Sequence, residues 1–373
     1  MSKKRILIVV DSVVMRRALT AALANSLGLE VAGSAPNGRV ALMRIPLLHP
    51  DAVVLDVELL EQACLETLRA ITAAYPQLPV IMLSAANDRA ASETLDALTM
   101  GAKDYLMKPD IATTSATALQ VFSDELTSKV VPHCLVVSWI GPASAFPAPS
   151  ATADPPLNMT GCRPAARADV VAIGASVGGP NALMELLPRF SSDFPAPILI
   201  VQHMPANFTK FLAARLASKC QVHVAEGSLN QVVMPGHAWI APGDLHMSVE
   251  RKGDGVRIVT RRGLPVNSCR PAADVLFRSV AEAYGAHALA VVLTGMGQDG
   301  FRGCQDINAA GGQVIVQDEA TSVVWGMPGF VVRGGIADRI LPLQELGPEI
   351  ANRVWSQRPE LHAPLPHEAR RGH

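Results

Sequence analysis

The sequence is poor in the residues on which nucleic-acid binding depends. Only 4% of its 373 residues are aromatic, and 32 Lys and Arg against 33 Asp and Glu leave a net charge of −1. A nucleic-acid binder needs a basic face and often stacks bases on aromatic rings. We therefore expect no nucleic-acid partner.

Closely spaced cysteine pairs are absent too. The six cysteines are Cys64, Cys134, Cys162, Cys220, Cys269 and Cys304. This spacing is unlike that of a zinc knuckle, a redox CxxC motif or a disulfide framework. We expect free thiols in a reducing compartment.

Long apolar runs are also lacking. The N-terminal run at 6–10 ends at Asp11, which makes it shorter than the roughly seven or more residues of a secretory signal. No stretch approaches the roughly 20 residues of a membrane span. These absences predict a cytoplasmic protein without membrane insertion.

A segment rich in Pro and small residues divides the chain. Its composition cannot pack a core and favours extended conformations. At roughly 150 residues per domain, the length allows two or three domains. We expect an N-terminal domain over 1–128, a linker over 129–168, a second domain over 169–355 and a disordered tail over 356–373.

Before the linker, apolar strand-like runs alternate with helical patterns. We expect strands at 5–10, 52–57, 78–83 and 103–107, and helices at 13–26, 61–74 and 87–99. Such alternation predicts a parallel sheet covered on both faces. Polar residues at the carboxyl ends of parallel strands line the functional crevice, and here these residues are Asp11, Asp56, Ser84 and Lys108.

These four strand-end residues suit a phosphoryl group. The carboxylates of Asp11 and Asp56 can hold Mg²⁺, and a carboxylate can accept a phosphoryl group. Lys108 can neutralise an added phosphate, and the Ser84 hydroxyl can donate to it. One Asp or Lys at a strand end is usually only solvated, but four at four strand ends favour a phosphate site.

Residues 4–127 resemble a response-regulator receiver domain. The matching pieces are ILIVVDSVVMRR, VVLDVE, VIMLSA and GAKDYLMKP. The resemblance implies a flavodoxin-like, five-stranded parallel sheet and phosphorylation on Asp56 by a histidine kinase with Mg²⁺. It also implies that Ser84, Lys108 and Tyr105 are the switch residues.

Two positions depart from the receiver pattern. Receivers usually have two acidic residues after the first strand, where this chain has Val10 and Asp11. They usually have Met-Pro and an acidic, Gly-containing loop after the phosphorylation site, where this chain has LLEQAC at 59–64. Both changes border the Mg²⁺ site, so we predict weak metal binding and inefficient phosphorylation.

After the linker the alternation resumes. We expect strands at 169–175, 196–202 and 287–295, with strand and hairpin insertions at 222–262. This pattern predicts a second α/β domain, Rossmann-like in its parallel sheet.

Ser176, His203 and Asp299 each follow one of these strands. Ser176 lies in a G-x-S-x-G sequence that opens a helical segment, and alone such a sequence is more often a packing turn. With His203 and Asp299 at the same sheet edge, a nucleophilic triad is favoured, in which the His takes the serine proton and the Asp orients the imidazole.

A competing motif is present at Gly295, Gly297 and Gly300. These glycines form G-x-G-x-x-G after a strand, with Asp318 about 20 residues on, as in a dinucleotide-binding oxidoreductase. That interpretation leaves Ser176 and His203 without roles, so we favour the triad.

Residues 169–354 resemble the catalytic domain of the chemotaxis-specific protein-glutamate methylesterases. The matching motifs are AIGASVGGP, VQHMP, MPGHAWIAPGDLHM, CRPAADVLFRSVA, VVLTGMGQDG and QDEATSVVWGMPG. The resemblance implies hydrolysis of glutamate γ-methyl esters, and deamidation of certain glutamines, on methyl-accepting chemoreceptors in chemotaxis adaptation or related signalling. It assigns Ser176 as nucleophile, His203 as general base, Asp299 as orienter and the Met296 backbone N–H to the oxyanion, with no cofactor for the ester chemistry.

Some positions carry no role in this assignment. Val177 replaces the Thr or Ser that usually follows the nucleophile, and His223, His237 and His246 are expected to be structural or to face the substrate. We expect a monomer. A non-catalytic adaptor that only docks to receptors is a further alternative, which the intact triad disfavours.

Overall fold

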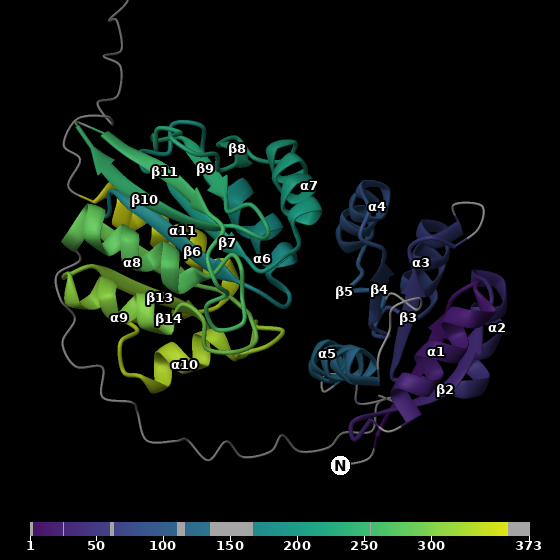
Figure 1. Cartoon of the computed structure of the whole chain (residues 1–373). Helices are drawn as coiled ribbons and strands as arrows, with labels where there is room; N and C mark the ends of the chain where they lie inside the picture. Colours follow the sequence, from purple (N-terminus) through teal and green to yellow (C-terminus); the bar gives the residue numbers. More distant parts are fainter. Residues whose placement is uncertain are drawn as a thin grey trace, which may run out of the picture.

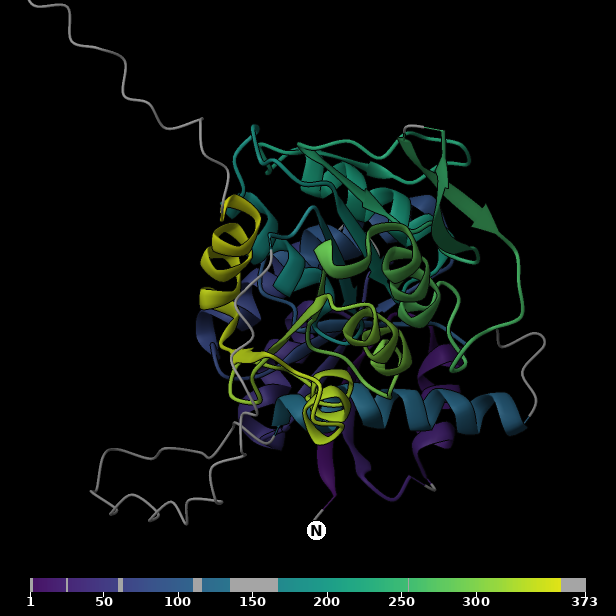
Figure 2. The same cartoon turned by 90° about the vertical axis from the view of Figure 1, so that its left-hand side faces the viewer.

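The chain folds into two α/β domains that lie side by side (Figure 1). The computed structural model describes residues 3–24, 26–59, 63–109, 116–134, 167–253 and 255–356. Figure 2, turned by 90°, shows helix α5 (Ala116–Cys134) running across the lower part of the view, behind the C-terminal domain.

The N-terminal domain is built on a five-stranded parallel sheet in the order β2-β1-β3-β4-β5. Its central strands are continuous apolar runs and are buried on both faces, as a sheet between two helix layers requires. The elements are β1 (Lys4–Val9), α1 (Val13–Ala24), β2 (Leu29–Ala35), α2 (Gly38–Leu48), β3 (Ala52–Asp56), α3 (Ala63–Ala74), β4 (Val80–Ser84), α4 (Asp88–Thr99), β5 (Asp104–Met107) and α5.

The C-terminal domain holds a seven-stranded parallel sheet in the order β14-β13-β12-β6-β7-β9-β8, and an antiparallel hairpin, β10-β11. Its strands are β6 (Val170–Ala175), β7 (Ile198–Gln202), β8 (His223–Glu226), β9 (His237–Ile240), β10 (His246–Lys252), β11 (Gly255–Arg261), β12 (Ala288–Val292), β13 (Gln313–Gln317) and β14 (Arg339–Leu341). Its helices are α6 (Gly179–Leu186), α7 (Ala206–Ala217), α8 (Ala273–Tyr284), α9 (Phe301–Ala309), α10 (Met327–Arg333) and α11 (Leu343–Trp355).

The order of the second sheet explains where its site can form. From β6 the chain adds β7 on one side and later β12 on the other. The carboxyl ends of these three strands therefore flank the point where the direction of winding reverses, which is where open parallel sheets bind ligands.

The two domains are joined mainly through α4 and α7. The Tyr105 ring stacks on Phe208, with centroids 4.8 Å apart. Arg215 pairs with Asp96 at 2.9 Å, and Asn181 Nδ2 donates to the Ala102 carbonyl at 3.3 Å. Apolar packing, stacking and an ion pair thus connect the domains directly.

The structure departs from the sequence expectation at three elements of the N-terminal domain, which are β2, α2 and α5. Strand β2 was not expected, because its polar residues and partial exposure hide it from an apolar pattern. Helix α5 continues to Cys134, so the first residues of the expected linker at 129–168 are helical. Val130 and Cys134 are buried against the first domain, which holds the helix together despite Pro132.

Most of the expected linker and nearly all of the expected tail lie outside the described residues. Within the part of the chain that is described, no helix combines the length and apolarity needed to cross a membrane.

Candidate active site

Ser176 and His203 follow adjacent strands of the C-terminal sheet. Strands β6 and β7 pair in parallel, with Ala175 opposite Gln202. The next residues stay in register, because the His203 N–H donates to the Ala175 carbonyl at 3.0 Å. Gln202 Nε2 also donates to the Ser176 carbonyl at 2.9 Å. The sequence expectation that both residues lie at one sheet edge is therefore met.

Ser176 occupies a tight turn between β6 and α6. Its carbonyl accepts the Gly179 N–H at 2.9 Å, and Gly178 between them has a φ of 76°, which favours glycine. A Cβ on Gly295 would lie 2.9 Å from Ser176 Cβ, so the loop after β12 needs glycine to pass this close. The serine stands half-exposed at the N-terminus of α6, where negative charge is favoured.

Asp299 is buried and fully hydrogen-bonded in the loop after β12. Oδ2 accepts the Ala273 N–H at 2.6 Å and lies 2.8 Å from His203 Nε2. Oδ1 accepts Asn267 Nδ2 at 2.9 Å and the Asp274 N–H at 3.2 Å. Burial raises the pKa of Asp299, but the bonds from His203 and the other donors outweigh it, and the pKa stays below its ordinary value.

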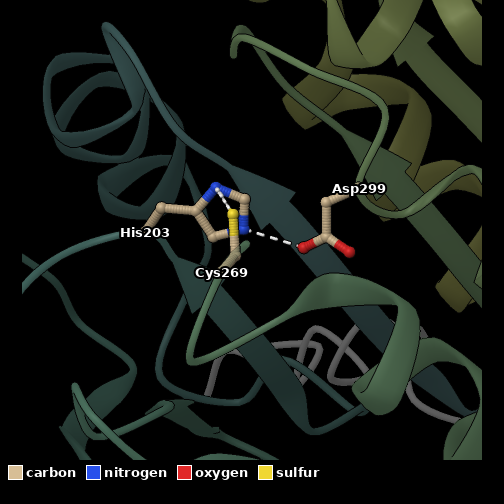
Figure 3. A group of neighbouring side chains, drawn as sticks. All are labelled: His203, Cys269 and Asp299. Atoms are coloured by element: carbon tan, nitrogen blue, oxygen red, sulfur yellow. Dashed lines mark hydrogen bonds and ion pairs between the residues drawn. The ribbon is translucent and has the colours of Figure 1, made fainter. Parts of the chain in front are cut away.

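Asp299 lies beyond the Nε2 edge of the His203 ring, and Cys269 is drawn in front of the ring (Figure 3). Nε2 contacts the carboxylate, and Nδ1 lies 3.6 Å from Cys269 Sγ. Burial lowers the pKa of His203, yet the bonds with Asp299 and Cys269 dominate and raise it to about 9.

The structure does not join the three predicted residues in one hydrogen-bonded chain. Among the hydrogen bonds of the described residues, none links the Ser176 hydroxyl to His203. Such bonds are often long before substrate binds. Met296 is exposed beside the site, and Val177 is buried with its carbonyl accepting the Thr294 hydroxyl at 2.9 Å.

A cavity of about 500 Å³ opens beside His203. From the C-terminal domain it is lined by His203, Met204, Pro205, Ala206, Asp244, Ser268, Cys269 and Arg270. The N-terminal domain supplies Tyr105, Met107, Glu125 and Lys129. The face of the site that holds His203 is thus bounded by the other domain.

The acidic site of the N-terminal domain gathers the predicted strand-end residues. Lys108 Nζ lies 2.7 Å from Asp56 Oδ1 and 2.7 Å from Glu58 Oε2. Burial raises the pKa of Asp56 against the opposing effect of Lys108, while the bond from Lys108 lowers the pKa of Glu58. The Ser84 hydroxyl accepts a bond from Thr94 at 2.8 Å.

The residues present fit a magnesium ion in part. Strands β1 and β3 pair in parallel with Val9 opposite Leu55, so Asp11 and Asp56 lie at the same edge of the sheet and offer the oxygen ligands that Mg²⁺ prefers. The Val10 side chain is fully buried in an apolar cluster. It contributes neither charge nor a ligand atom.

Structural contacts are made by Tyr105 and by two histidines outside the proposed triad, His237 and His246. Tyr105 lies at the domain interface, with Lys129 Nζ 4.6 Å above its ring and bonded to its carbonyl. His237 stacks on Trp239, and His246 Nε2 bonds the Leu264 carbonyl. The Asp318 carboxylate accepts two bonds from Thr321, which makes it a turn-forming residue.

Sequence reasoning missed Asn267, Cys269 and Glu58. The first two lie in the turn 266–269, whose contacts with Asp299 and His203 span 32 and 66 residues. No local pattern signals such contacts. Glu58 could have been noticed as an acidic residue two positions after Asp56.

Comparison with known proteins gives one consistent family. Residues 171–350 match the CheB methylesterase family, and residues 6–118 match the response regulator receiver domain. The chain is 49% identical to a protein-glutamate methylesterase/protein-glutamine glutaminase of Trichodesmium erythraeum, over 95% of this chain and 100% of that one. A relative of the same name in Nocardioides sp. is 43% identical over 96% of this chain and 97% of that one.

A solved structure is also similar to the C-terminal domain. The CheB methylesterase catalytic domain of Thermotoga maritima is 40% identical and covers 50% of this chain and 98% of its own, with a TM-score of 0.49.

Proposed function

The chain belongs to the protein-glutamate methylesterase family with an N-terminal receiver domain, and from this we propose a residue-level mechanism. The receiver implies Mg²⁺ binding for phosphorylation, and the family implies a chemosensory kinase and chemoreceptor substrates. We propose that the enzyme hydrolyses glutamate γ-methyl esters, and deamidates certain glutamines, on the cytoplasmic part of methyl-accepting chemoreceptors.

One observation carries the assignment of the triad. His203 lies beside Ser176 at the ends of two paired strands and holds Asp299 through Nε2 at 2.8 Å. Because Nε2 donates to the carboxylate, Nδ1 is the basic atom. His203 Nδ1 would take the Ser176 proton, and Asp299 would hold the ring and stabilise the imidazolium.

The acyl transfer then follows from these roles. Ser176 Oγ attacks the ester carbonyl, and the oxyanion forms near the N-terminus of α6 and the Met296 backbone N–H. Removing one such donor typically costs about 3 kcal/mol of transition-state stabilisation. His203 returns the proton to the leaving methanol, and water, activated by the same base, releases the glutamate and Ser176.

The receiver domain would control this reaction by covering one face of the active site. Tyr105, Glu125 and Lys129 bound the cavity beside His203, and α4 packs on α7, which begins three residues after His203. A large receptor cannot approach a site that is covered on this face. We propose that phosphorylation of Asp56, with Ser84, Lys108 and Tyr105 as switch residues, loosens the contact.

The Mg²⁺ site would be weaker than in most receivers. Asp11 and Asp56 would hold the ion, which supplies charge neutralisation to the incoming phosphoryl group. Val10 adds no carboxylate, and Lys108 already occupies Asp56 Oδ1. The protein would act in the cytoplasm as a monomer.

Methanol release from methylated receptor tests the proposal. The wild-type enzyme should release methanol, and Ser176→Ala should lose activity by about 10³-fold or more. A Ser176→Ala enzyme within tenfold of wild type would refute the triad.

A further inference from the structure

Cys269 Sγ lies beside the atom that we assign as the base. It is 3.6 Å from His203 Nδ1, while Asp299 Oδ2 lies 2.8 Å from Nε2, and the thiol is drawn in front of the imidazole ring in Figure 3. Because Nε2 donates to Asp299, Nδ1 is the nitrogen of neutral His203 that is left to accept a proton, and the thiol lies within hydrogen-bonding reach of it. The pair can therefore exchange a proton.

The backbone fixes the thiol at this place. Val266 and Cys269 exchange two backbone hydrogen bonds, at 3.0 and 2.8 Å. Asn267 and Ser268 between them have φ values of 51° and 63°, as in the tight turns of two-residue hairpins. The Asn267 side chain donates to both Asp299 and Asp274. One turn thus holds both Asp299 and the thiol at the imidazole.

Cys269 also differs from the other described cysteines in its access. It is half-buried and lines the cavity beside His203 with Arg270. Burial raises the pKa of Cys64 and of Cys134 to about 12, and that of Cys220 to about 11. Because the thiolate is the reactive form, those thiols are protected. Among the described cysteines, only Cys269 combines cavity access with an imidazole partner.

A metal ion suits this cluster less well than a proton. The ligand atoms of His203, Cys269 and Asp299 lie within 4.8 Å of one another. Both Asp299 oxygens are already occupied, each by two hydrogen-bonding groups. Cys269 Sγ and His203 Nδ1 remain, whereas protein zinc sites use three or four protein ligands.

We propose that Cys269 is an oxidation site, with a hydroperoxide as its reactant, that disables the neighbouring base. The Sγ proton passes to His203 Nδ1. The thiolate attacks one peroxide oxygen, the S–O bond forms and the O–O bond breaks. Sulfur is oxidised to the sulfenic acid, and the peroxide is reduced to water or an alcohol with the proton from Nδ1.

The new oxygen explains the expected effect on the esterase. It occupies space beside Nδ1, where the Ser176 hydroxyl must deliver its proton, and it can hydrogen-bond that nitrogen. A thiol reductant removes it, so the inhibition is reversible. This consequence rests on the proposed function, whereas the reactivity of Cys269 rests only on its contact with His203.

Thiol labelling of the full-length protein tests that reactivity without the esterase assay. In EDTA at pH 7, iodoacetamide should alkylate Cys269 about tenfold faster than half-buried Cys220, as read by peptide mass spectrometry. His203→Gln should slow Cys269 about tenfold and leave Cys220 unchanged. Unlabelled Cys64 confirms that each variant is folded. Equal rates at Cys269 and Cys220, or no effect of His203→Gln, would overturn the proposal.

Peroxide treatment tests the consequence. Wild type and Cys220→Ala should each lose tenfold or more of their own untreated activity, regain it with dithiothreitol, and yield a dimedone adduct on Cys269. Cys269→Ala should stay within twofold of its own untreated activity. Equal inactivation of Cys269→Ala, or full activity of wild type with Cys269 oxidised, contradicts the proposal. If no untreated protein releases methanol, the proposed function fails, and the labelling rates still decide the reactivity of Cys269.

Discussion

The ring of Tyr105 stacks on the ring of Phe208, with centroids 4.8 Å apart and planes 10° from parallel. Tyr105 lies three residues before Lys108, which binds Asp56, and Phe208 lies on α7, five residues after His203. Both rings are buried. The proposed phosphorylation site of one domain and the proposed base of the other are therefore linked through a single packed contact.

Weakening this interface should raise the basal activity. Arg215→Glu would place a carboxylate against Asp96, where a 2.9 Å ion pair now joins α7 to α4. The pair is partly exposed, so its loss alone is worth less than about 1 kcal/mol, and repulsion adds to that. We expect methanol release without phosphodonor to rise severalfold. Deletion of residues 1–165 should raise it further.

A charge swap provides the control for that prediction. Asp96→Arg combined with Arg215→Glu restores the attraction and should return the basal activity to the wild-type level. Arg261→Glu, on the exposed hairpin, should change little. Unchanged activity in Arg215→Glu and in a well-folded 166–373 fragment would refute inhibition by the receiver.

Substitutions in the proposed triad should differ in severity. Ser176→Ala removes the nucleophile and should cost about 10³-fold or more in kcat. Asp299→Asn should cost less, because Asp299 acts through His203. Single-turnover methanol release measures both. A larger loss in Asp299→Asn than in Ser176→Ala would argue against these roles.

Asn267 should be a positioning residue. Its amide donates to Asp299 and Asp274, two buried carboxylates that would otherwise repel. Asn267→Ala removes both bonds, at a cost of about 1–2 kcal/mol, which corresponds to about a 5–30-fold loss in kcat. Ser268→Ala, at the exposed neighbouring position, is the matched control. A shift in the pH profile of Asn267→Ala would separate positioning from a general loss of stability.

The pH dependence should follow His203. The neutral imidazole is the base, and its pKa is raised to about 9 by Asp299 and Cys269 against the effect of burial. The value of kcat/KM should therefore rise with pH up to about 9, after subtraction of the Ser176→Ala background. Cys269→Ala removes one of the contacts that raise the pKa of His203, so it should lower the pH midpoint of the kcat/KM profile. A midpoint near the ordinary value of 6.5 in wild type would contradict the geometry.

The raised pKa of His203 also predicts how the free energy of unfolding depends on pH. A folded pKa above the unfolded value means that folding favours the protonated form. The contribution of His203 is therefore complete below about pH 6.5 and is lost as the pH rises through 9. His203→Gln should flatten this part of the curve of unfolding free energy against pH.

Position 10 should control the Mg²⁺ site of the receiver. Val10→Asp adds a carboxylate near Asp11 and Asp56, so we expect tighter Mg²⁺ binding and faster phosphorylation by acetyl phosphate. Because Val10 is buried among apolar side chains, the variant should melt at a lower temperature in EDTA and recover with Mg²⁺. Val14→Asp, on the exposed face of α1, is the control. Equal phosphorylation of wild type and Val10→Asp would show that the wild-type site is not impaired.

The sequence predicted the elements whose residues repeat a strong local pattern. Continuous apolar runs located β1, β3, β6 and β7, and the polar residues after them located Asp56, Ser176 and His203. Strand β2 was not predicted because its centre is half-exposed and contains Gly33 and Ser34. Its place is set by pairing with β1.

The remaining parts of the site depend on contacts between distant segments. Asn267 and Cys269 reach Asp299 and His203 because a turn with two positive φ angles aims them there. No local pattern in the sequence VNSC at 266–269 indicates that direction. The interface between Tyr105 and Phe208 likewise depends on how two domains dock, which no single-domain pattern contains.

The central claim is a receiver-controlled ester hydrolysis at Ser176, and one measurement tests it most directly. Methanol release from methylated chemoreceptor would be followed for wild type and Ser176→Ala, each with and without acetyl phosphate and Mg²⁺. We predict release by wild type that increases with acetyl phosphate, and release near background by Ser176→Ala in both conditions. Release by Ser176→Ala at the wild-type rate, or none by wild type in either condition, would contradict the account.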